Sequence, residues 1–598
     1  MTDINNTTNS DAQHDLQDYD LDTPINTSSG LRQGLTAYGD THFSLFLRKV
    51  FIKAAGYGED ALSRPIVGII NTGSGFNPCH ATTPQLIEAV KRGIQLQGGL
   101  AIEFPTISLH ESFASPTSMF LRNLMSMDTE EMIKAQPIDV CVTIGGCDKT
   151  TPAQLMGGIS ANKPIFPLIV GPMMPGSFRG TRIGACTDCR NNWAAYRAGT
   201  LDMEDIAEIN EELAPTSGTC GVMGTASTMA CVLVALGLMP FDGASAPAVS
   251  SARLRVAERT GAAAALAARA SEKSFYRPQR LLTKDSFYNA ITVLQAIGGS
   301  TNAVVHLMAI VNRHPALAGT EAVTLKTFDD IGRKTPLLID LKPSGDNYMT
   351  DFHNAGGMLA LLHELKPLLH LNAMTLSGKT LGEELASKPF KKFLFSSQIV
   401  RPLSDPLYPS SALAVLYGNL APGGAVIKAS ASKDRRLLEY SGPAVVFENT
   451  EDLRRRIDRD DLDVTPNSVL VLKNIGPIGN PGMPEAVIPI PRKLHTTDML
   501  RVSDGRMSGT AGGTIVLHIS PETAIPGSPL RLVRSGDFIK MSLEKRSLDV
   551  DVSDEELTRR RAEDEQKSMV SETGNCNARH RKKQRGYRGL YEASVNQA

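Results

Sequence analysis

The chain has 598 residues, of which 41% are hydrophobic and 21% are charged. These values are typical of a folded globular protein of roughly two to four domains, and they exclude disorder over most of its length. The 62 Lys and Arg residues nearly balance the 63 Asp and Glu residues, which gives a net charge of -1. The chain therefore has no overall electrostatic affinity for nucleic acid or an anionic membrane. Its longest strongly apolar run, from Met229 to Met239, is shorter than the ~18 residues of a spanning helix, so we expect no membrane partner.

Residues 1–30 contain no Lys or Arg and several Asp residues, unlike a secretory or mitochondrial leader. We expect them to form a disordered tail on a cytoplasmic protein. The eight cysteines are sparse and dispersed rather than arranged as a compact disulfide framework. We expect them to be reduced, and metal ligation stays open for some of them.

From about residue 64 the chain alternates apolar strands with helices, which predicts an α/β fold with a parallel sheet. Strands are expected at 65–71, 101–108 and 138–144, and a helix is expected to begin at Thr83 and Pro84. Ligands of such sheets bind outside the carboxyl ends of the strands. Candidate site residues follow all three strands there: Cys79, Glu111, Cys147, Asp148 and Lys149.

A fourth loop, 215–220, ends at Cys220 and leads into a helix of small residues, whose N-terminus would present free backbone amides. After about residue 397 the pattern changes to shorter strands separated by Gly and Pro turns. We therefore predict a first α/β domain over 31–397. A second, β-rich domain is predicted over 398–598, with a charged tail at its end.

Three local patterns have a functional and an ordinary interpretation. Cys186 and Cys189 form a CxxC pair, which suits half a zinc site or a redox dithiol, but no second pair completes it and two reduced loop thiols are preferred. His363 and Glu364 lack the second His one turn later that a zinc-protease helix carries. The basic stretch 579–588 follows an acidic run, so a solvated tail is preferred to a nucleic-acid contact.

Cys79, Cys147 and Cys220 are also open to two interpretations on the residues alone. Their wide separation has no diagnostic value, and structural thiols are the simpler interpretation. Three thiolates, however, can hold an iron–sulfur cluster with one iron left open as a Lewis acid. Glu111 and Asp148 are hard oxygen ligands of the kind that magnesium prefers.

Five motifs in order resemble the signature blocks of one family, the iron–sulfur dehydratases of dihydroxy acids, aldonic (sugar) acids and phosphogluconate. The motifs are NPCH at 77–80, GGCDKTTP at 145–152, GTCGVMGTASTM at 218–229, GGSTN at 298–302 and SDGRMSGT at 503–510. The resemblance covers about residues 30 to 590. It is closest to the sugar-acid (arabinonate/xylonate-like) branch, because of Glu111 and the block at 507–522.

The resemblance implies two cofactors. An iron–sulfur cluster, with [2Fe-2S] favoured over [4Fe-4S], is implied on Cys79, Cys147 and Cys220, and its open iron takes the departing C3 hydroxyl. Magnesium is implied on Glu111, Asp148, Glu485 and a carbamylated Lys149. Carbamylation makes physical sense, since it turns a cationic amine into an anionic oxygen ligand.

The resemblance also implies the catalytic groups and the reaction. Ser508 is implied as the base that removes the C2 proton, and Thr510 as a substrate-binding residue. A serine hydroxyl is a weak base, so the two metals must favour its alkoxide. The implied reaction removes water from a 2,3-dihydroxy carboxylic acid, with an aldonic acid favoured, to give a 2-keto-3-deoxy acid.

Two alternatives stay open: a dihydroxy-acid dehydratase of branched-chain amino-acid biosynthesis, and a catalytically inactive binding relative. The chain departs from the family pattern at Ala153, in the loop 72–76, and at Ser594, where a His is expected. The implied fold is an N-terminal parallel-sheet α/β domain and a C-terminal β-barrel-like α/β domain, with the site between them. A homodimer or homotetramer is implied as well.

Overall fold

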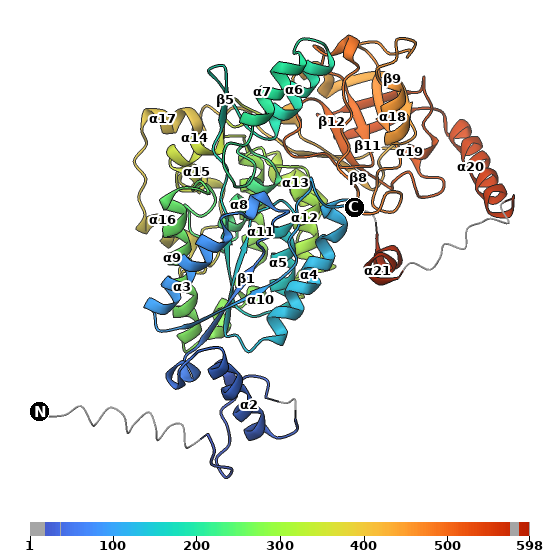
Figure 1. Cartoon of the computed structure of the whole chain (residues 1–598). Helices are drawn as coiled ribbons and strands as arrows, with labels where there is room; N and C mark the ends of the chain where they lie inside the picture. Colours follow the sequence, from blue (N-terminus) through green and yellow to red (C-terminus); the bar gives the residue numbers. More distant parts are fainter. Residues whose placement is uncertain (1–17, 36–37, 575–584, 597–598) are drawn as a thin grey trace, which may run out of the picture.

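The structure is a computed structural model, and it describes residues 18–35, 38–574 and 585–596 (Figure 1). Most of the tail predicted at 1–30, and most of the predicted basic tail, lie outside these residues. Within the described part, Asp18 forms ion pairs with Arg32 and with the buried Lys49, at 2.6 and 2.8 Å. Figure 1 shows the first elements, with helix α2 (Thr41–Ala54), extending below the body of the molecule.

Four parallel strands form the first sheet, in the order β2-β1-β3-β4. They are β1 (Ile66–Asn71), β2 (Leu100–Pro105), β3 (Val140–Gly145) and β4 (Ile165–Ile169). The first three coincide closely with the strands expected from the sequence, and every pairing is parallel. The prediction of a parallel-sheet α/β domain is therefore confirmed. The strands read as continuous apolar runs because helices bury both faces of the sheet.

The helices on one face approach each other closely through glycine. This face is covered by α3 (Thr83–Leu96) and α9 (Ser251–Arg269). A Cβ atom on Gly93 of α3 would lie 2.0 Å from the backbone oxygen of Glu258, and one on Gly261 of α9 would lie 2.3 Å from that of Val90. Only glycine permits this crossing. The opposite face is covered by α4 (Ser118–Ala135) and α5 (Thr150–Ala161).

A group of buried helices extends the core beyond the sheet. Every residue of α8 (Thr225–Ala235) is buried, and α11 (Lys284–Ala296) and α12 (Asn302–Val311) pack against it. A helix that is apolar on all sides belongs inside a core. The other helices of the first domain are α6 (Thr187–Arg197), α7 (Met203–Glu212), α10 (Pro278–Leu281), α13 (Leu325–Gly332), α14 (Met349–Asn354), α15 (Gly357–Leu365), α16 (Leu381–Ser387) and α17 (Leu394–Ile399). None of the helices in the described residues is long and apolar enough to cross a membrane.

Eight strands form the second sheet, in the order β14-β13-β9-β10-β11-β12-β8-β7. Pairing is parallel from β9 to β12 and antiparallel on both sides of them. The strands are β7 (Ala414–Leu416), β8 (Gly424–Ile427), β9 (Glu439–Phe447), β10 (Val469–Leu472), β11 (Arg501–Ser503), β12 (Ile515–Ser520), β13 (Phe538–Ser542) and β14 (Ser547–Asp551). Around them lie α18 (Thr450–Arg456), α19 (Pro529–Leu532), α20 (Asp554–Gly574) and α21 (Gly586–Ser594).

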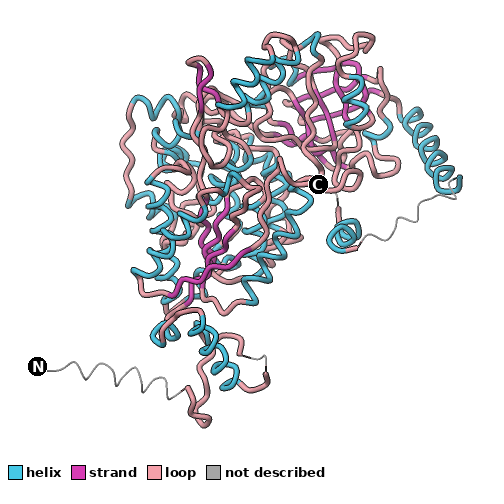
Figure 2. The backbone as a smooth tube through the Cα atoms, viewed as in Figure 1, coloured by secondary structure: helices cyan, strands magenta, loops and turns pink. Residues whose placement is uncertain are grey.

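The edges of the second sheet nearly meet. The amide of Leu548 in β14 donates to the backbone oxygen of Tyr417, which directly follows β7, at 2.8 Å, and the amide of Tyr417 donates to Arg546 at 2.9 Å. The strands enclose one apolar core, and the sheet curls around it (Figure 2). The prediction of a β-barrel-like second domain is confirmed.

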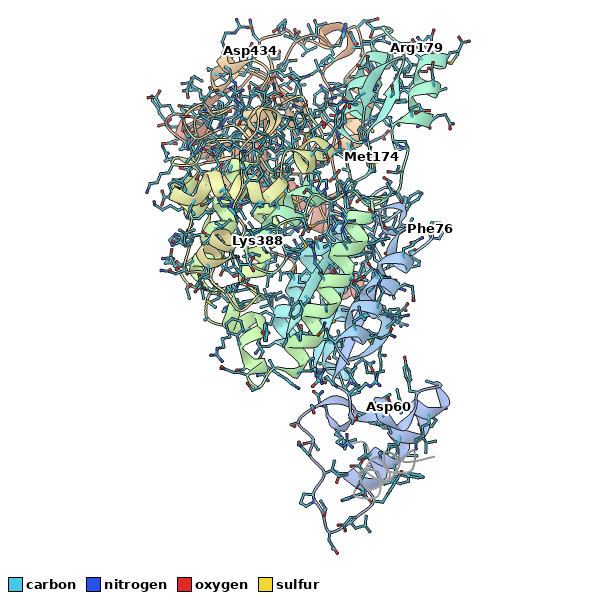
Figure 3. The ribbon with its side chains drawn as sticks, turned by 90° about the vertical axis from the view of Figure 1, so that its left-hand side faces the viewer. Asp60, Phe76, Met174, Arg179, Lys388 and Asp434 are labelled. Atoms are coloured by element: carbon cyan, nitrogen blue, oxygen red, sulfur yellow. The ribbon has the colours of Figure 1, made fainter. Side chains whose placement is uncertain are left out.

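The two domains meet along α6, which follows a short hairpin in the chain. The hairpin is formed by β5 (Gly176–Phe178) and β6 (Thr181–Ile183). Arg197 of α6 pairs with Asp458 of the second domain at 2.7 Å. Figure 3 shows Arg179 of the hairpin at the same end of the molecule as Asp434 of the second domain. Lys149, which follows β3, lies 3.7 Å from Glu485 of the second domain, so the carboxyl ends of the first sheet face the barrel.

Candidate functional site

The loops that follow the first three strands carry side chains into one region. Cys79 lies in a short 3-10 helix (Pro78–His80) after β1, and Glu111 follows β2. Cys147, Asp148 and Lys149 connect β3 to α5. The sulfurs of Cys79 and Cys147 and a ring nitrogen of His110 lie within 4.8 Å of one another. These side chains meet because carboxyl ends of parallel strands share one edge of a sheet.

The surroundings of Cys79 make its thiol more acidic than an ordinary cysteine. Its hydrogen bonds with Cys147 and with His110 outweigh burial and lower the pKa of Cys79 to about 6. A hydrogen bond fixes the backbone of Cys147, because its amide donates to Nε2 of His80 at 3.0 Å. Burial lowers the pKa of His80 to about 4, so this ring is neutral and accepts the bond. His80 and His110 were not predicted as site residues, although each adjoins a candidate residue.

Three further thiols, Cys186, Cys189 and Cys220, lie beside this group. The sulfur of Cys220 is 3.4 Å from that of Cys186, which immediately precedes α6, and Cys189 lies in the first turn of α6. The preferred interpretation of Cys186 and Cys189 as loop thiols therefore missed their proximity to Cys220. The CxxC spacing was the available signal, but nothing in the sequence links it to a residue about 30 positions later.

Three carboxylates converge on Lys149, whose side chain is fully buried. Its Nζ contacts Asp148, and it lies 2.9 Å from Glu111 and 3.7 Å from Glu485. Burial and Arg506 lower the pKa of Lys149, but the carboxylates outweigh them and the pKa is raised. Glu485 comes from the second domain, so this cluster spans the domain boundary.

Arg506 completes the carboxylate cluster and was not predicted as a site residue. Its side chain is buried, with Nη1 2.8 Å from Glu485 and Nη2 3.1 Å from Glu111. Glu111 also accepts hydrogen bonds from the hydroxyls of Thr117 and Ser118. Burial alone would raise the pKa of Glu111, but Lys149 and Arg506 hold it far below its usual range. The signal for Arg506 was its place in the block 503–510.

Ser508 lies in a loop that is fixed from several sides. Its Oγ is 2.9 Å from Oγ1 of Thr510, and the backbone oxygen of Thr510 accepts from the hydroxyl of Thr187 at 3.1 Å. Nε of Arg190 donates to Oγ1 of Thr510 at 3.4 Å. Lys428 donates to the backbone oxygen of Gly509 at 3.3 Å, and burial lowers the pKa of Lys428 to about 7.

Close packing explains the glycines around Ser508. A Cβ atom on Gly509 would lie 2.4 Å from Cβ of Ser300, in the GGSTN motif. One on Gly224 would lie 2.8 Å from Cγ2 of Thr510. Three of the sequence motifs therefore meet at the serine loop, which the sequence order alone does not show.

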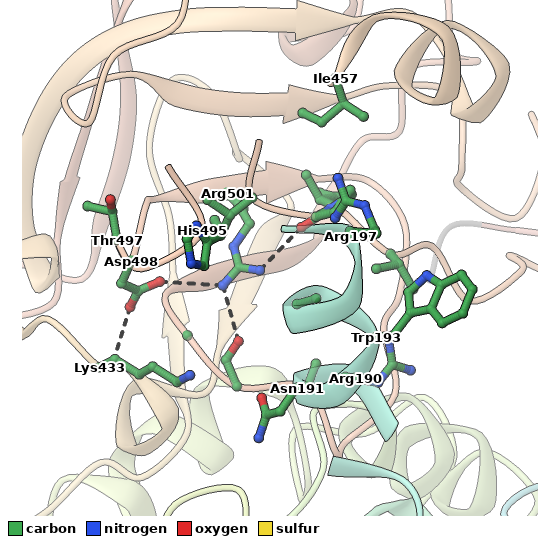
Figure 4. Close-up of a pocket in the computed structure, with 18 of the residues that line it drawn as sticks. Arg190, Asn191, Trp193, Arg197, Lys433, Ile457, His495, Thr497, Asp498 and Arg501 are labelled. Carbon is green, nitrogen blue, oxygen red and sulfur yellow. Dashed lines mark hydrogen bonds and ion pairs between the residues drawn. The ribbon is translucent and has the colours of Figure 1, made fainter. Parts of the chain in front are cut away.

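A cavity of about 1020 Å³ opens beside the site, between α6 and the second domain. Cys189, Arg190, Met507 and Gly512 are among its lining residues. Figure 4 shows α6, with Arg190 and Asn191, facing Lys433, Asp498 and Arg501 of the barrel. The lining is rich in polar and cationic groups, which suits a hydroxylated anion.

The remaining local patterns form no metal group within the described residues. Nε2 of His363 is 2.8 Å from the backbone oxygen of Lys388, and Glu364 pairs with Lys392. Both side chains have ordinary structural partners.

Two family profiles match the chain. The N-terminal profile of the dihydroxy-acid/6-phosphogluconate dehydratases matches residues 64–384, and the C-terminal profile matches residues 398–598. The chain is 41% identical over 533 residues to an L-arabinonate dehydratase of Rhizobium leguminosarum bv. trifolii, which covers 88% of this chain and 90% of the relative.

Two other relatives cover a similar share. A 6-deoxy-6-sulfo-D-gluconate dehydratase of Pseudomonas putida is 40% identical over 547 residues, 90% of each chain. A dihydroxy-acid dehydratase of Pyrococcus furiosus is 36% identical over 538 residues, 87% of this chain and 92% of the relative.

Proposed function

Because the chain belongs to the dihydroxy-acid/6-phosphogluconate dehydratase family, we propose that it removes water from an aldonic acid to give a 2-keto-3-deoxy acid. The observation that carries this proposal is the junction of three side-chain groups at the domain boundary. A carboxylate cluster, a group of thiols and the Ser508 loop all meet there. A dehydratase needs an acid for the leaving hydroxyl and a base for the C2 proton: metals held by the thiols and carboxylates would supply the first, and Ser508 the second.

The carboxylate cluster fits a magnesium ion. In the structure the ammonium of Lys149 occupies the point where Glu111, Asp148 and Glu485 converge, so a cation is already accommodated there. Hard carboxylate oxygens are the ligands that Mg²⁺ prefers. We propose that these three residues and a carbamylated Lys149 hold the ion. Carbamylation would remove the positive charge of the Lys149 ammonium, which would otherwise repel Mg²⁺.

The thiols fit an iron–sulfur cluster. Cys79 and Cys147 lie together, and the charge of Cys79 affects the pKa of Cys220, which places the third thiol nearby. Thiolates are the ligands of such clusters, and the low pKa of Cys79 favours its thiolate form. We propose [2Fe-2S] in preference to [4Fe-4S] on these three cysteines.

When bound, the two metal centres supply Lewis acidity to the leaving hydroxyl and to the substrate carboxylate. Ser508 then removes the C2 proton, and Thr510, 2.9 Å away, holds its hydroxyl in place. Arg190 reaches both Thr510 and Glu485 and orients the polar end of the substrate. Lys428 fixes the peptide that follows Ser508.

The relatives and the cavity support an aldonic acid as the substrate. Two relatives are named for five- or six-carbon sugar acids, and the adjacent cavity offers Arg190, Asn191 and Lys433 to hydroxyls and carboxylate. A branched-chain dihydroxy acid would leave such polar groups without partners, which costs binding energy. The more distant relationship to dihydroxy-acid dehydratases keeps that reaction as the second candidate.

We also propose that the protein is a cytoplasmic homodimer or homotetramer. A cluster on reduced thiols requires a reducing compartment. Three phenylalanines of α2, Phe43, Phe46 and Phe51, are exposed, and an apolar surface of this kind suits contact with a second copy.

The test is an anaerobic assay of iron-reconstituted protein with Mg²⁺, following 2-keto acid formation. Pentonates, hexonates and 2,3-dihydroxyisovalerate are compared as substrates. Turnover of an aldonic acid is expected. Turnover of dihydroxyisovalerate alone would show that the second candidate reaction is the correct one. No turnover by cluster-loaded protein would support the hypothesis that the chain is a catalytically inactive binding protein.

The role of Ser508 is tested separately. Ser508→Ala should lower kcat by about a thousandfold or more and leave the visible cluster spectrum intact. Ser528→Ala is the matched control, because Ser528 is buried outside the site and its hydroxyl has no hydrogen-bond partner in the described residues. Retained activity in Ser508→Ala would refute the assignment.

A further inference from the structure

A second cavity, of about 580 Å³, lies beneath α21 and shares no lining residue with the cavity beside the site. Its walls come from α4, α12, β8 and α21 and are mostly apolar, with Met119, Met127 and Met308 among them. Its volume is in the range of small-molecule sites. Methionine side chains adapt to the shape of an apolar ligand.

One end of this cavity carries a guanidinium without a counter-charge. Arg122 of α4 lines the cavity, and its Nη1 donates to Nδ1 of His306 at 3.0 Å. Its Nε is buried and has no acceptor, and Arg122 forms no ion pair with any residue that the structure describes. A buried cation in this state is costly unless an anion accompanies it.

The neighbouring histidines add donors without acceptors. A guanidinium only donates, so Nδ1 of His306 is the acceptor and its Nε2 carries the proton. That buried Nε2 has no partner in the described residues, and neither does either ring nitrogen of His518, which lines the cavity and is 5% exposed. His518 also has a φ of 56°, in the left-handed region that a non-glycine residue seldom adopts.

The single charge of Arg122 and the apolar walls of the cavity determine which class of ligand fits it. Burial holds the pKa of both histidines well below the ordinary value, so Arg122 supplies a single positive charge. A doubly charged phosphate would remain half neutralised, and a sugar acid would lose hydrogen bonds of its hydroxyls against apolar walls. We propose that this cavity binds a small monocarboxylate with an apolar body, with its carboxylate on Arg122 and its body among the methionines.

The site is linked to the loop that carries Glu485. The hydroxyl of Tyr591 in α21 accepts from the amide of Gly482 and donates to the backbone oxygen of Pro477, both at 2.9 Å. Gly482 and Met483 line the cavity, and the backbone oxygen of Met483 accepts from Nε of Arg506 at 2.6 Å. A ligand in this cavity therefore contacts the residues that position Arg506.

Calorimetric titration of the metal-loaded protein with octanoate tests the proposal. Saturable binding is expected, and the neutral octanamide should bind at least about tenfold more weakly. Arg122→Gln should weaken octanoate binding by a similar factor. Arg588→Gln is the matched control, since Arg588 of α21 stacks over Phe120 but does not line the cavity, and it should leave the affinity within about twofold.

A second variant localises the ligand even if Arg122→Gln fails to fold. Ala309 lines the cavity on α12, and Ala309→Phe fills it without changing a charge, so it should abolish octanoate binding. No binding by the wild type, equal binding of octanamide, or unchanged binding in Ala309→Phe would each overturn the proposal. Octanoate has no hydroxyl to lose, so these outcomes are independent of the dehydratase reaction.

Discussion

The two halves of the candidate site differ in how their charges are balanced. In the carboxylate half, Glu111 and Glu485 lie 2.8 to 3.7 Å from Lys149 or Arg506, so anions and cations neutralise one another. In the thiol half, Cys79 and Cys147 hydrogen-bond mainly to each other and to His110. The first half is thus held by its own ion pairs, whereas the second has only weak thiol contacts of its own, and we expect a bound metal to add most of its stabilisation.

The two halves also differ in which domains supply their residues. Arg506 and Glu485 belong to the second domain, and Glu111 and Lys149 to the first. The carboxylate half therefore ties the two domains together before any ligand binds. The thiols Cys79, Cys147 and Cys220 all belong to the first domain.

The largest expected effect is the loss of Arg506. In metal-free protein, Arg506→Met should lower the free energy of unfolding by about 3 kcal/mol, because it removes one of the two buried cations that pair with the partly buried carboxylates of Glu111 and Glu485. Urea unfolding followed by the fluorescence of Trp193, the single tryptophan, measures the change. Arg190→Met is the control, since Arg190 lies 3.8 Å from Glu485 and is partly exposed, and it should cost under about 1 kcal/mol. Equal losses of unfolding free energy in the two variants would show that the ion pairs of Arg506 do not hold the carboxylate half together.

A smaller effect is expected from a hydroxyl that supports the same cluster. Thr117 donates to Glu111 at 2.6 Å and accepts from Arg506 at 2.8 Å, so Thr117→Val should cost about 1–3 kcal/mol. Thr129, on the same helix, is fully buried and its hydroxyl has no hydrogen-bond partner in the described residues. Thr129→Val should therefore be neutral or stabilising. A cost for Thr129→Val equal to that for Thr117→Val would contradict this account.

The pH dependence of stability should also come from the carboxylate half. The pKa of Glu111 is lower in the folded state than in the unfolded state, so the folded state favours the ionised form. Its contribution is complete above the ordinary pKa of about 4.5 and is lost as the pH falls below that value. At pH 3.5 the metal-free wild type should have lost about 1 kcal/mol through this group.

Glu111→Gln provides the comparison for this pH effect. The variant has no carboxylate at this position, so its unfolding free energy should fall less steeply between pH 5 and pH 3.5. Urea unfolding curves at the two pH values give the slope. Parallel pH profiles for wild type and variant would show that Glu111 is not preferentially ionised in the folded protein.

Much of the fold could be predicted from local sequence signals. The apolar runs that became β1, β2 and β3 alternate with helices, and this alternation determines a parallel sheet and the common edge on which Cys79, Glu111 and Cys147 lie. The barrel closure through Tyr417 and Leu548 could not be derived this way, because it depends on pairing between residues about 130 positions apart. That part of the fold came from the family resemblance.

Long-range contacts also explain which site residues were missed. Arg506 acts through Glu111, about 400 positions away, and Cys186 through Cys220, and neither has a distinctive local pattern of its own. His110 adjoins Glu111 in sequence, but its contact with Cys79 exists only after β1 and β2 pair. Local patterns thus identified the strand ends, while the partners that tune them depend on tertiary structure.

The smallest expected effect on stability lies in the thiol half. In metal-free protein, Cys220→Ser should change the free energy of unfolding by under about 1 kcal/mol, because the thiol contact with Cys186 at 3.4 Å is weak. After iron reconstitution the same variant should lack the visible cluster spectrum, while Cys189→Ser should retain it. A loss of several kcal/mol in metal-free Cys220→Ser would mean that the thiols stabilise the fold unaided. The contrast between the two halves would then fail, since both would be held together without a ligand.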